Sequence, residues 1–163
     1  MTLLAIDGPA GAGKTTYAAK LEAELSANAT VKVIHMDDLY NGWENPLNNA
    51  LSEILDRVTT AHLAGREFVI KKFNWELMQF DREESISPTD YLIIEGVGAA
   101  QQIVRDSGAT TYWLDIEPEI GLRRVLERDG VHIEAHMRQW QVEQDKHFAR
   151  DETRENCEFK LTS

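Results

Sequence analysis

The chain has 163 residues, of which 42% are apolar and 28% are charged. At roughly 150 residues per domain, this length predicts one globular domain over residues 1–163. The 28 acidic and 17 basic residues give a net charge of −11, which argues against nucleic acids and anionic membranes as partners. The single cysteine, Cys157, excludes an internal disulfide. No apolar run is long enough to span a bilayer, and the first residues lack a signal-peptide pattern, so we expect a soluble cytoplasmic protein.

Short apolar runs alternate with longer helical patterns along the chain. Runs typical of buried strands stand at residues 3–6, 31–34, 68–70, 91–94 and 112–114. Apolar residues at helical spacing predict helices at residues 14–27, 46–64, 99–107, 117–129 and 132–150. This alternation predicts an α/β fold with a doubly wound, mostly parallel sheet that has helices on both faces. A ligand is then expected beyond the carboxyl ends of the strands.

The boundaries of some elements carry their own signals. Asn45 and Pro46 have the residue types expected at the N-cap and first position of a helix, and Gly65 fits the end of that helix. Residues 159–161 are a candidate final strand. Residues 73–90 show no clear pattern and end in a turn.

The segment 8–15 reads Gly-Pro-Ala-Gly-Ala-Gly-Lys-Thr and fits the phosphate-loop pattern G-x-x-x-x-G-K-[ST]. A predicted strand precedes it and a predicted helix starts within it, as this motif requires. Glycines let the backbone N–H groups turn toward phosphate oxygens at the positive end of the helix. Lys14 is expected at the β- and γ-phosphates, and the Thr15 hydroxyl at Mg²⁺. The expected ATP-binding residues are Gly8, Ala10, Gly11, Ala12, Gly13, Lys14, Thr15 and Thr16.

Several classes of phosphate-loop protein are excluded by motifs that the sequence lacks. A GTPase needs the base-reading pattern N-K-x-D, and a transporter ATPase needs a signature similar to L-S-G-G-Q. The chain is also too short for the second subdomain of the larger ring ATPases. The small metabolite kinases remain.

Two carboxylates, Asp37 and Asp38, follow the second predicted strand. In a doubly wound sheet this position lies beside the phosphate loop, where an acceptor hydroxyl would approach. A carboxylate there can take the hydroxyl proton as the oxygen attacks the γ-phosphoryl group, and Tyr40 and Trp43 can stack on or hydrogen-bond to an organic acceptor. The alternative is that the two acids only cap a turn.

Residues 6–16, together with Asp37-Asp38-Leu39-Tyr40, resemble the uridine kinase branch of the phosphate-loop kinases. That branch has D-S-F-Y at the second segment, so the resemblance implies that Asp37 is the general base and that Tyr40 contacts the substrate. Asp38 is a further candidate contact. Trp75 is another, because uridine kinases carry aromatic residues in a comparable segment, although core packing explains a tryptophan there equally well.

Further candidates lie in the second half of the chain. Glu95 follows the apolar run 91–94 and resembles the acid that holds Mg²⁺ in these kinases; the alternative is an acid in a turn. Arg124 and Arg128 precede a break at 129–130 and resemble the arginines of a kinase lid over about 124–138; the alternative is a solvated helix face. His132 and His136 are expected to face solvent.

Together these features predict a kinase that uses ATP and Mg²⁺ to phosphorylate a hydroxyl of a nucleoside-like metabolite. The expected sheet has five parallel strands in the order 2-3-1-4-5 and carries a short helical lid. Two alternatives stay open: a nucleoside monophosphate kinase, and a nucleotide-binding regulator or slow NTPase without an acceptor.

Overall fold

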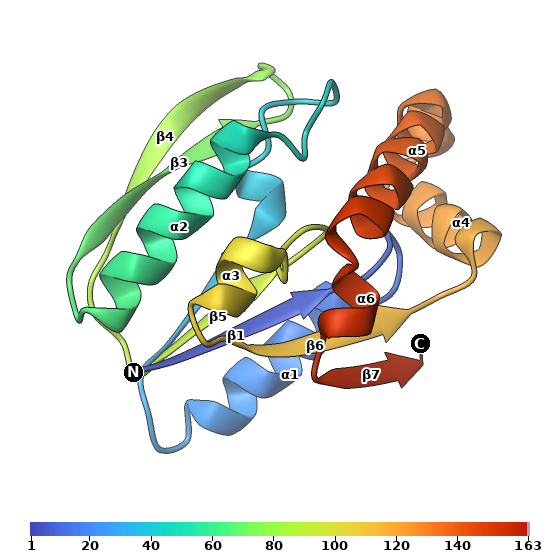
Figure 1. Cartoon of the computed structure of the whole chain (residues 1–163). Coiled ribbons are helices and arrows are strands. Elements are labelled where there is room, and N and C mark those ends of the chain that lie inside the picture. Colours follow the sequence, from blue (N-terminus) through green and yellow to red (C-terminus); the bar gives the residue numbers. More distant parts are fainter. Residues whose placement is uncertain (163) are drawn as a thin grey trace.

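The computed structural model describes residues 1–162, and residue 163 lies outside this range. A sheet of five strands runs through the molecule (Figure 1) and consists of β1 (Thr2–Asp7), β2 (Val31–His35), β5 (Tyr91–Glu95), β6 (Thr110–Asp115) and β7 (Phe159–Thr162). The strands lie in the order β2-β5-β1-β6-β7, and every pairing is parallel. Counted along the chain within the sheet, the order has the predicted form 2-3-1-4-5, but its third, fourth and fifth strands are β5, β6 and β7 and not the predicted runs 68–70, 91–94 and 112–114.

Helices cover both faces of the sheet, as predicted. They are α1 (Lys14–Leu25), α2 (Asn49–Leu63), α3 (Gln102–Asp106), α4 (Pro118–Asp129), α5 (Glu134–Asp151) and α6 (Thr153–Asn156), with 3₁₀ turns η1 (Met36–Asp38) and η2 (Val131–Ile133). Because side chains alternate along a strand, Leu3 and Ala5 of β1 pack into the core under α2, α3 and α5. Leu4 and Ile6 point to the opposite face, where they pack against Ala18 of α1. Burial of both faces explains the continuous apolar runs of these strands.

One predicted strand is not part of the central sheet. The run at 68–70 lies in β3 (Phe68–Asn74), which pairs with β4 (Gln79–Ile86) as a separate antiparallel hairpin. The third strand of the central sheet is therefore β5 and not this run. In Figure 1 the hairpin lies beside α2, apart from the central sheet. Its second strand was not predicted because β4 is mostly exposed and highly charged, and therefore lacks an apolar pattern.

The boundaries of α2 differ from the prediction at one end. The N-cap is Asn48, whose side-chain oxygen accepts a hydrogen bond from the backbone N–H of Leu51. Asn45 has a left-handed backbone (φ 44°) and cannot be the extended N-cap residue, so Pro46 stays in the loop. The predicted end is confirmed: the helix stops at Leu63, and Gly65 follows with φ 65°.

The predicted break between the last two long helices is also confirmed. α4 ends at Asp129, and Gly130, with φ 100°, turns the chain into η2 and α5. Within residues 1–162, no helix is both long and apolar enough to cross a membrane.

Candidate active site

The phosphate loop connects β1 to α1 and is shaped by its glycines. Gly8 and Gly11 have φ values of 143° and 84°, and Gly13, the N-cap of α1, has 91°. A Cβ at Gly8 would lie 2.1 Å from the backbone oxygen of Leu114, and one at Gly11 would lie 2.3 Å from that of Gly121. No other residue fits either position. The first turn of α1 has neither a side-chain cap nor an acidic residue, which suits it to an anion.

Lys14 is buried inside the curl of this loop, where its Nζ donates to the backbone oxygen of Pro9 at 2.7 Å. Burial lowers the pKa of Lys14, and the nearby carboxylates of Asp7, Glu95 and Asp37 oppose that effect. A lysine held among carboxylates and backbone N–H groups provides a point charge for a phosphate.

Asp7 is a site residue that the sequence analysis missed. It is fully buried, and it accepts hydrogen bonds from the backbone N–H groups of Gly8 at 2.7 Å, Gly98 at 3.0 Å and Ala100 at 2.9 Å. Burial raises the pKa of Asp7 to about 6, although these hydrogen bonds act to lower it. Asp7 thereby fixes the phosphate loop to the segment after β5. The sequence pattern that marks Asp7 is the same as for Glu95, namely a carboxylate directly after a buried apolar run.

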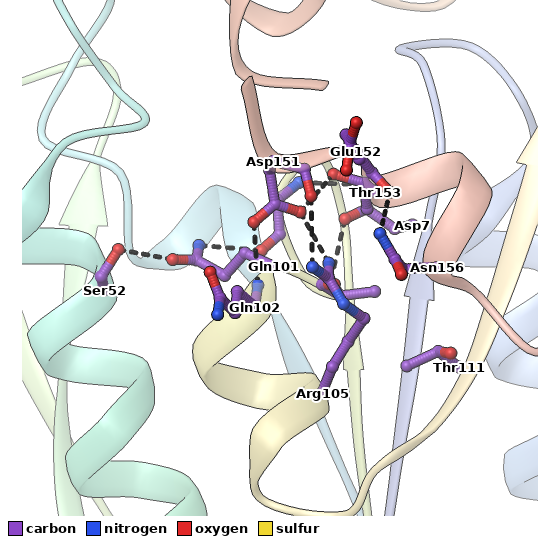
Figure 2. A network of polar contacts seen from close by, with 12 residues as sticks. Asp7, Ser52, Gln101, Gln102, Arg105, Thr111, Asp151, Glu152, Thr153 and Asn156 are labelled. Carbon is purple, nitrogen blue, oxygen red and sulfur yellow. Dashed lines mark hydrogen bonds and ion pairs between the residues drawn. The ribbon is translucent and has the colours of Figure 1, made fainter. Parts of the chain in front are cut away.

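A second network of polar contacts extends this anchoring (Figure 2). Arg105 Nη1 donates to Asp151 Oδ2 at 2.6 Å and to the backbone oxygen of Ala100 at 2.7 Å. Asp151 also accepts from the backbone N–H of Gln102 at 2.9 Å. Because Ala100 donates to Asp7, the C-terminal end of α5 and the phosphate loop are held to the same turn after β5.

Thr15 and Glu95 lie together, as expected for two groups that share a cation. The Thr15 hydroxyl donates to Glu95 Oε1 at 3.1 Å, and His35 Nδ1 lies 2.6 Å from the same oxygen. His35 was not predicted, and its hydrogen bond to Glu95 raises the pKa of His35. Within residues 1–162 no cluster of three His, Cys, Asp or Glu side chains could hold a metal ion by itself. One hydroxyl and one carboxylate fit Mg²⁺, which takes its remaining ligands from water and phosphate.

Asp37 lies in the same cleft, which has a volume of about 570 Å³ and extends from the phosphate loop to α5 and the tip of the hairpin. The side chain is open to the cleft, yet the protein crowds it closely. This desolvation, together with the charge of Glu95, raises the pKa of Asp37, while Lys14 and Arg128 act to lower it. The predicted base and the predicted phosphate-binding lysine are therefore neighbours across one cavity.

Two predicted substrate contacts occupy less direct positions. Tyr40 lines the cleft but is only 1% exposed, and its hydroxyl donates to the backbone oxygen of Val97 at 2.6 Å. It therefore supports the wall of the cleft from behind. Asp38 is not among the lining residues, because its carboxylate turns toward the hairpin and pairs with Lys72 Nζ at 3.3 Å. The prediction of Asp38 as a substrate contact is thus not supported by its position.

Three tryptophans line the same cleft and form one of its walls. Trp43 and Trp75 are both half-buried and line the cleft, with ring centroids 4.9 Å apart. Trp140 of α5 completes the wall with its ring 6.1 Å from that of Trp43. His136 is exposed, as predicted, but stacks on Trp43 at 4.8 Å and 11°. His132 is also exposed, as predicted, and in addition it lines the cleft.

The two predicted lid arginines line the cleft from α4. Arg124 Nη1 donates to the backbone oxygen of Gly11 in the phosphate loop at 3.3 Å. Arg128 makes two hydrogen bonds to Asp129, at 2.9 and 2.7 Å. Close approach of α4 to the loop requires a glycine on the helix as well, because a Cβ at Gly121 would lie 2.5 Å from a backbone oxygen of the loop.

Gln144 of α5 also reaches the phosphate loop. It is 2% exposed, and its Oε1 accepts a hydrogen bond from the backbone N–H of Ala10 at 3.1 Å. Nothing in the sequence marked this residue, because a single glutamine on a long, polar helix has no local pattern.

Comparisons with known proteins bear on the fold. No protein-family model matches the sequence, and no curated protein is similar to it. Among solved structures, a possible uridine kinase from Bacillus stearothermophilus has a TM-score of 0.67 and 21% identity, over 98% of this chain and 88% of that one. A shikimate kinase from Bacteroides thetaiotaomicron has a TM-score of 0.56 and 16% identity, over 99% of this chain and 85% of that one. A shikimate kinase from Acinetobacter baumannii in complex with shikimate has a TM-score of 0.58 and 15% identity, over 100% of this chain and 84% of that one. The chain thus has the fold of phosphate-loop kinases.

Proposed function

We propose that this protein is a kinase that transfers the γ-phosphoryl group of ATP to a hydroxyl group of a nucleoside-like metabolite. One observation carries the proposal: a single cleft brings together the phosphate loop with Lys14, the carboxylate of Asp37 and a wall of tryptophans. The phosphate loop and Lys14 suit a nucleoside triphosphate. The carboxylate of Asp37 can accept a hydroxyl proton, and the tryptophans suit an organic acceptor. Their shared cavity gives each feature a role in one reaction.

The phosphate loop and α1 would bind the triphosphate. Backbone N–H groups and Lys14 supply positive charge around the β- and γ-phosphates. Thr15 and Glu95 are the residues that would hold Mg²⁺, directly or through water. When bound, this ion neutralises charge on the β- and γ-phosphate oxygens.

Asp37 would act as the general base. The acceptor oxygen forms a bond to the γ-phosphorus, the bond from that phosphorus to the bridging oxygen of ADP breaks, and the hydroxyl proton passes to the Asp37 carboxylate. Crowding and the charge of Glu95 raise the pKa of Asp37, which makes its carboxylate a better proton acceptor near neutral pH. The positive charges of Lys14 and Arg128 act in the opposite direction and lower the pKa of Asp37.

Arg124 and Arg128 would stabilise the charge on the transferred group. Both line the cleft from α4, and Arg124 already touches the phosphate loop. The helix ends at Asp129, and Gly130, with a φ of 100°, provides a point about which α4 and α5 can change their angle. We therefore propose that residues 124–138 form a short lid that closes over the phosphates.

Transfer of label from [γ-³²P]ATP to a panel of neutral, cationic and anionic alcohols tests this function. We expect a phosphorylated product with the wild-type protein and none with Lys14→Ala. ATP binding without transfer to any alcohol would contradict the kinase and favour a nucleotide-binding regulator.

A further inference from the structure

The part of the cleft away from the phosphate loop has an unusual set of side chains. Trp43, Trp75 and Trp140 line it together with the carboxylates of Asp37 and Glu76. We call these five residues the acceptor half. They come from three separate segments: the loop after β2, the tip of the β3–β4 hairpin and α5.

The rings of the acceptor half are arranged around Trp43. The ring of Trp75 is tilted by 59° to it, and the ring of Trp140 is perpendicular at 88°. A set of mutually tilted rings presents faces as well as edges to a shared space, and an aromatic face carries negative electrostatic potential. The histidine ring of His136 lies flat on Trp43 at 4.8 Å, so a face of this tryptophan is already in contact with a nitrogen heterocycle.

The lysine and the two arginines that line the cleft make their hydrogen bonds outside the acceptor half. Lys14 donates to Pro9 within the phosphate loop, and Arg124 donates to Gly11 of the same loop. Arg128 is paired through two hydrogen bonds with Asp129. These three cations suit the phosphates of ATP, and none of them belongs to the acceptor half.

Apart from the indole N–H groups of Trp43 and Trp140, the acceptor half offers few groups that donate hydrogen bonds to a neutral ligand. No asparagine or glutamine side chain is among the residues that line the cleft in the part of the chain that the structure describes. The indole N–H of Trp75 is used by the backbone oxygen of Asp37, and the hydroxyl of Tyr40 by that of Val97. Glu76 is exposed to the cleft and pairs with no basic residue within residues 1–162.

Aromatic faces next to carboxylates attract cations and repel anions. A positive charge over a tryptophan face is attracted by the ring, and the attraction is stronger where the charge is removed from water. We propose that the phosphoryl acceptor is a cationic alcohol, which carries its positive charge on a planar ring or an ammonium group held between the tryptophans and Glu76. This inference rests on the proposed kinase function and narrows it. It excludes nucleoside monophosphates and carboxylic acids as acceptors, because the acceptor half would place their anions beside carboxylates.

A pair of ligands that differ only in charge tests the inference. N-Ribosylpyridinium is a cation, and the phenyl C-riboside is its neutral isostere with the same hydroxyl groups. Binding of each to the wild-type protein is measured by tryptophan fluorescence at about pH 8 with a nonhydrolysable ATP analogue present. We expect the cation to bind about tenfold more tightly than the neutral riboside.

Glu76→Gln removes one carboxylate from the acceptor half at an exposed turn, where the fold tolerates it. In this variant we expect the ratio of the two dissociation constants, about tenfold in the wild type, to fall to about threefold or less. Glu83→Gln is the matched control, because Glu83 is exposed on the same hairpin but does not line the cleft. It should retain the wild-type preference.

Equal or tighter binding of the neutral riboside would overturn the inference, and so would failure of the protein to bind either ligand. The readout is independent of phosphoryl transfer. If the protein prefers the cation but transfers no phosphoryl group to any alcohol, the kinase function is contradicted and the cation site is supported. If it transfers the phosphoryl group but does not prefer the cation, the kinase function is supported and the cation site is contradicted.

Discussion

The indole N–H of Trp75, at the tip of the β3–β4 hairpin, donates to the backbone oxygen of Asp37 at 3.0 Å. A hairpin outside the central sheet thus holds the loop that carries the proposed base. A second contact acts in the same direction, because Lys72 Nζ lies 3.3 Å from the carboxylate of Asp38. Lys72 also pairs with Glu84 on the opposite strand at 3.4 Å. The position of Asp37 therefore depends on the hairpin, through Trp75, which lines the cleft, and through Lys72, which does not.

Replacement of Lys72 tests this dependence. Lys72→Met removes the charge and keeps the length of the side chain, so we expect kcat to fall about three- to tenfold while KM for ATP stays unchanged. Lys71→Met is the control, because Lys71 is exposed on the other face of the same strand. Steady-state kinetics of both variants provide the measurement, and equal effects of the two substitutions would show that the hairpin does not position Asp37.

Lys14→Ala should abolish turnover and weaken binding of MgATP while the protein stays folded. The reason is that Lys14 supplies the point charge inside the phosphate loop. Calorimetric titration with MgATP measures the affinity, and circular dichroism confirms the fold. Lys20→Ala, at an exposed position of the same helix, should bind ATP as the wild type does. Unchanged affinity and turnover in a folded Lys14→Ala protein would remove the basis of the nucleotide site.

Alanine at Arg124 or Arg128 should lower kcat more than it raises KM for ATP, because these groups would act on charge that develops in the transition state. Arginines in this role contribute about 10³–10⁵-fold in other phosphoryl-transfer enzymes. Arg123→Ala is the control, because Arg123 is exposed on the same helix and does not line the cleft. Losses below about threefold at both sites would mean that they are ordinary surface charges.

Asp7 predicts a pH dependence of stability. Its pKa is raised from 3.8 to about 6 in the folded protein, so the folded state binds more protons than the unfolded state between about pH 4 and 6. Ionisation of Asp7 therefore reduces the free energy of unfolding as the pH rises through this window, by up to about 3 kcal/mol.

Urea unfolding of wild type and Asp7→Asn across this pH range isolates the effect. The variant lacks the titrating group, so the stability of wild type relative to the variant should decline from pH 4 to pH 6. Asp145→Asn, at an exposed position of α5, should follow the wild-type curve. A difference that grows with pH would show that the hydrogen bonds to Asp7 outweigh its burial.

The parts of the fold and site that could be predicted are those whose chemistry is local in sequence. The phosphate loop is predictable because Lys14 and the glycines before it lie within one short segment of the sequence. The central strands are predictable because burial on both faces makes them continuously apolar. The hairpin was missed because β4 is exposed and charged, so only pairing with β3 identifies it. Gln144 was missed because its contact with the phosphate loop joins residues that are far apart in the sequence.

The position of Asp38 shows a further limit. Its neighbour Asp37 faces the cleft while Asp38 faces Lys72, and adjacent residues of the same type give no indication of which one turns inward. That choice depends on η1, the single 3₁₀ turn that contains both residues.

Single-turnover transfer from labelled ATP to the acceptor, compared between wild type and Asp37→Asn, tests the role of Asp37 most directly. The amide keeps the shape of the side chain but cannot take the proton, so we expect the rate to fall at least about a hundredfold while ATP affinity stays within a few-fold. Asp38→Asn, the matched control, should lose much less because its carboxylate pairs with Lys72 outside the cleft. Equal losses in the two variants, or no loss in Asp37→Asn, would contradict the assignment of Asp37 as the base.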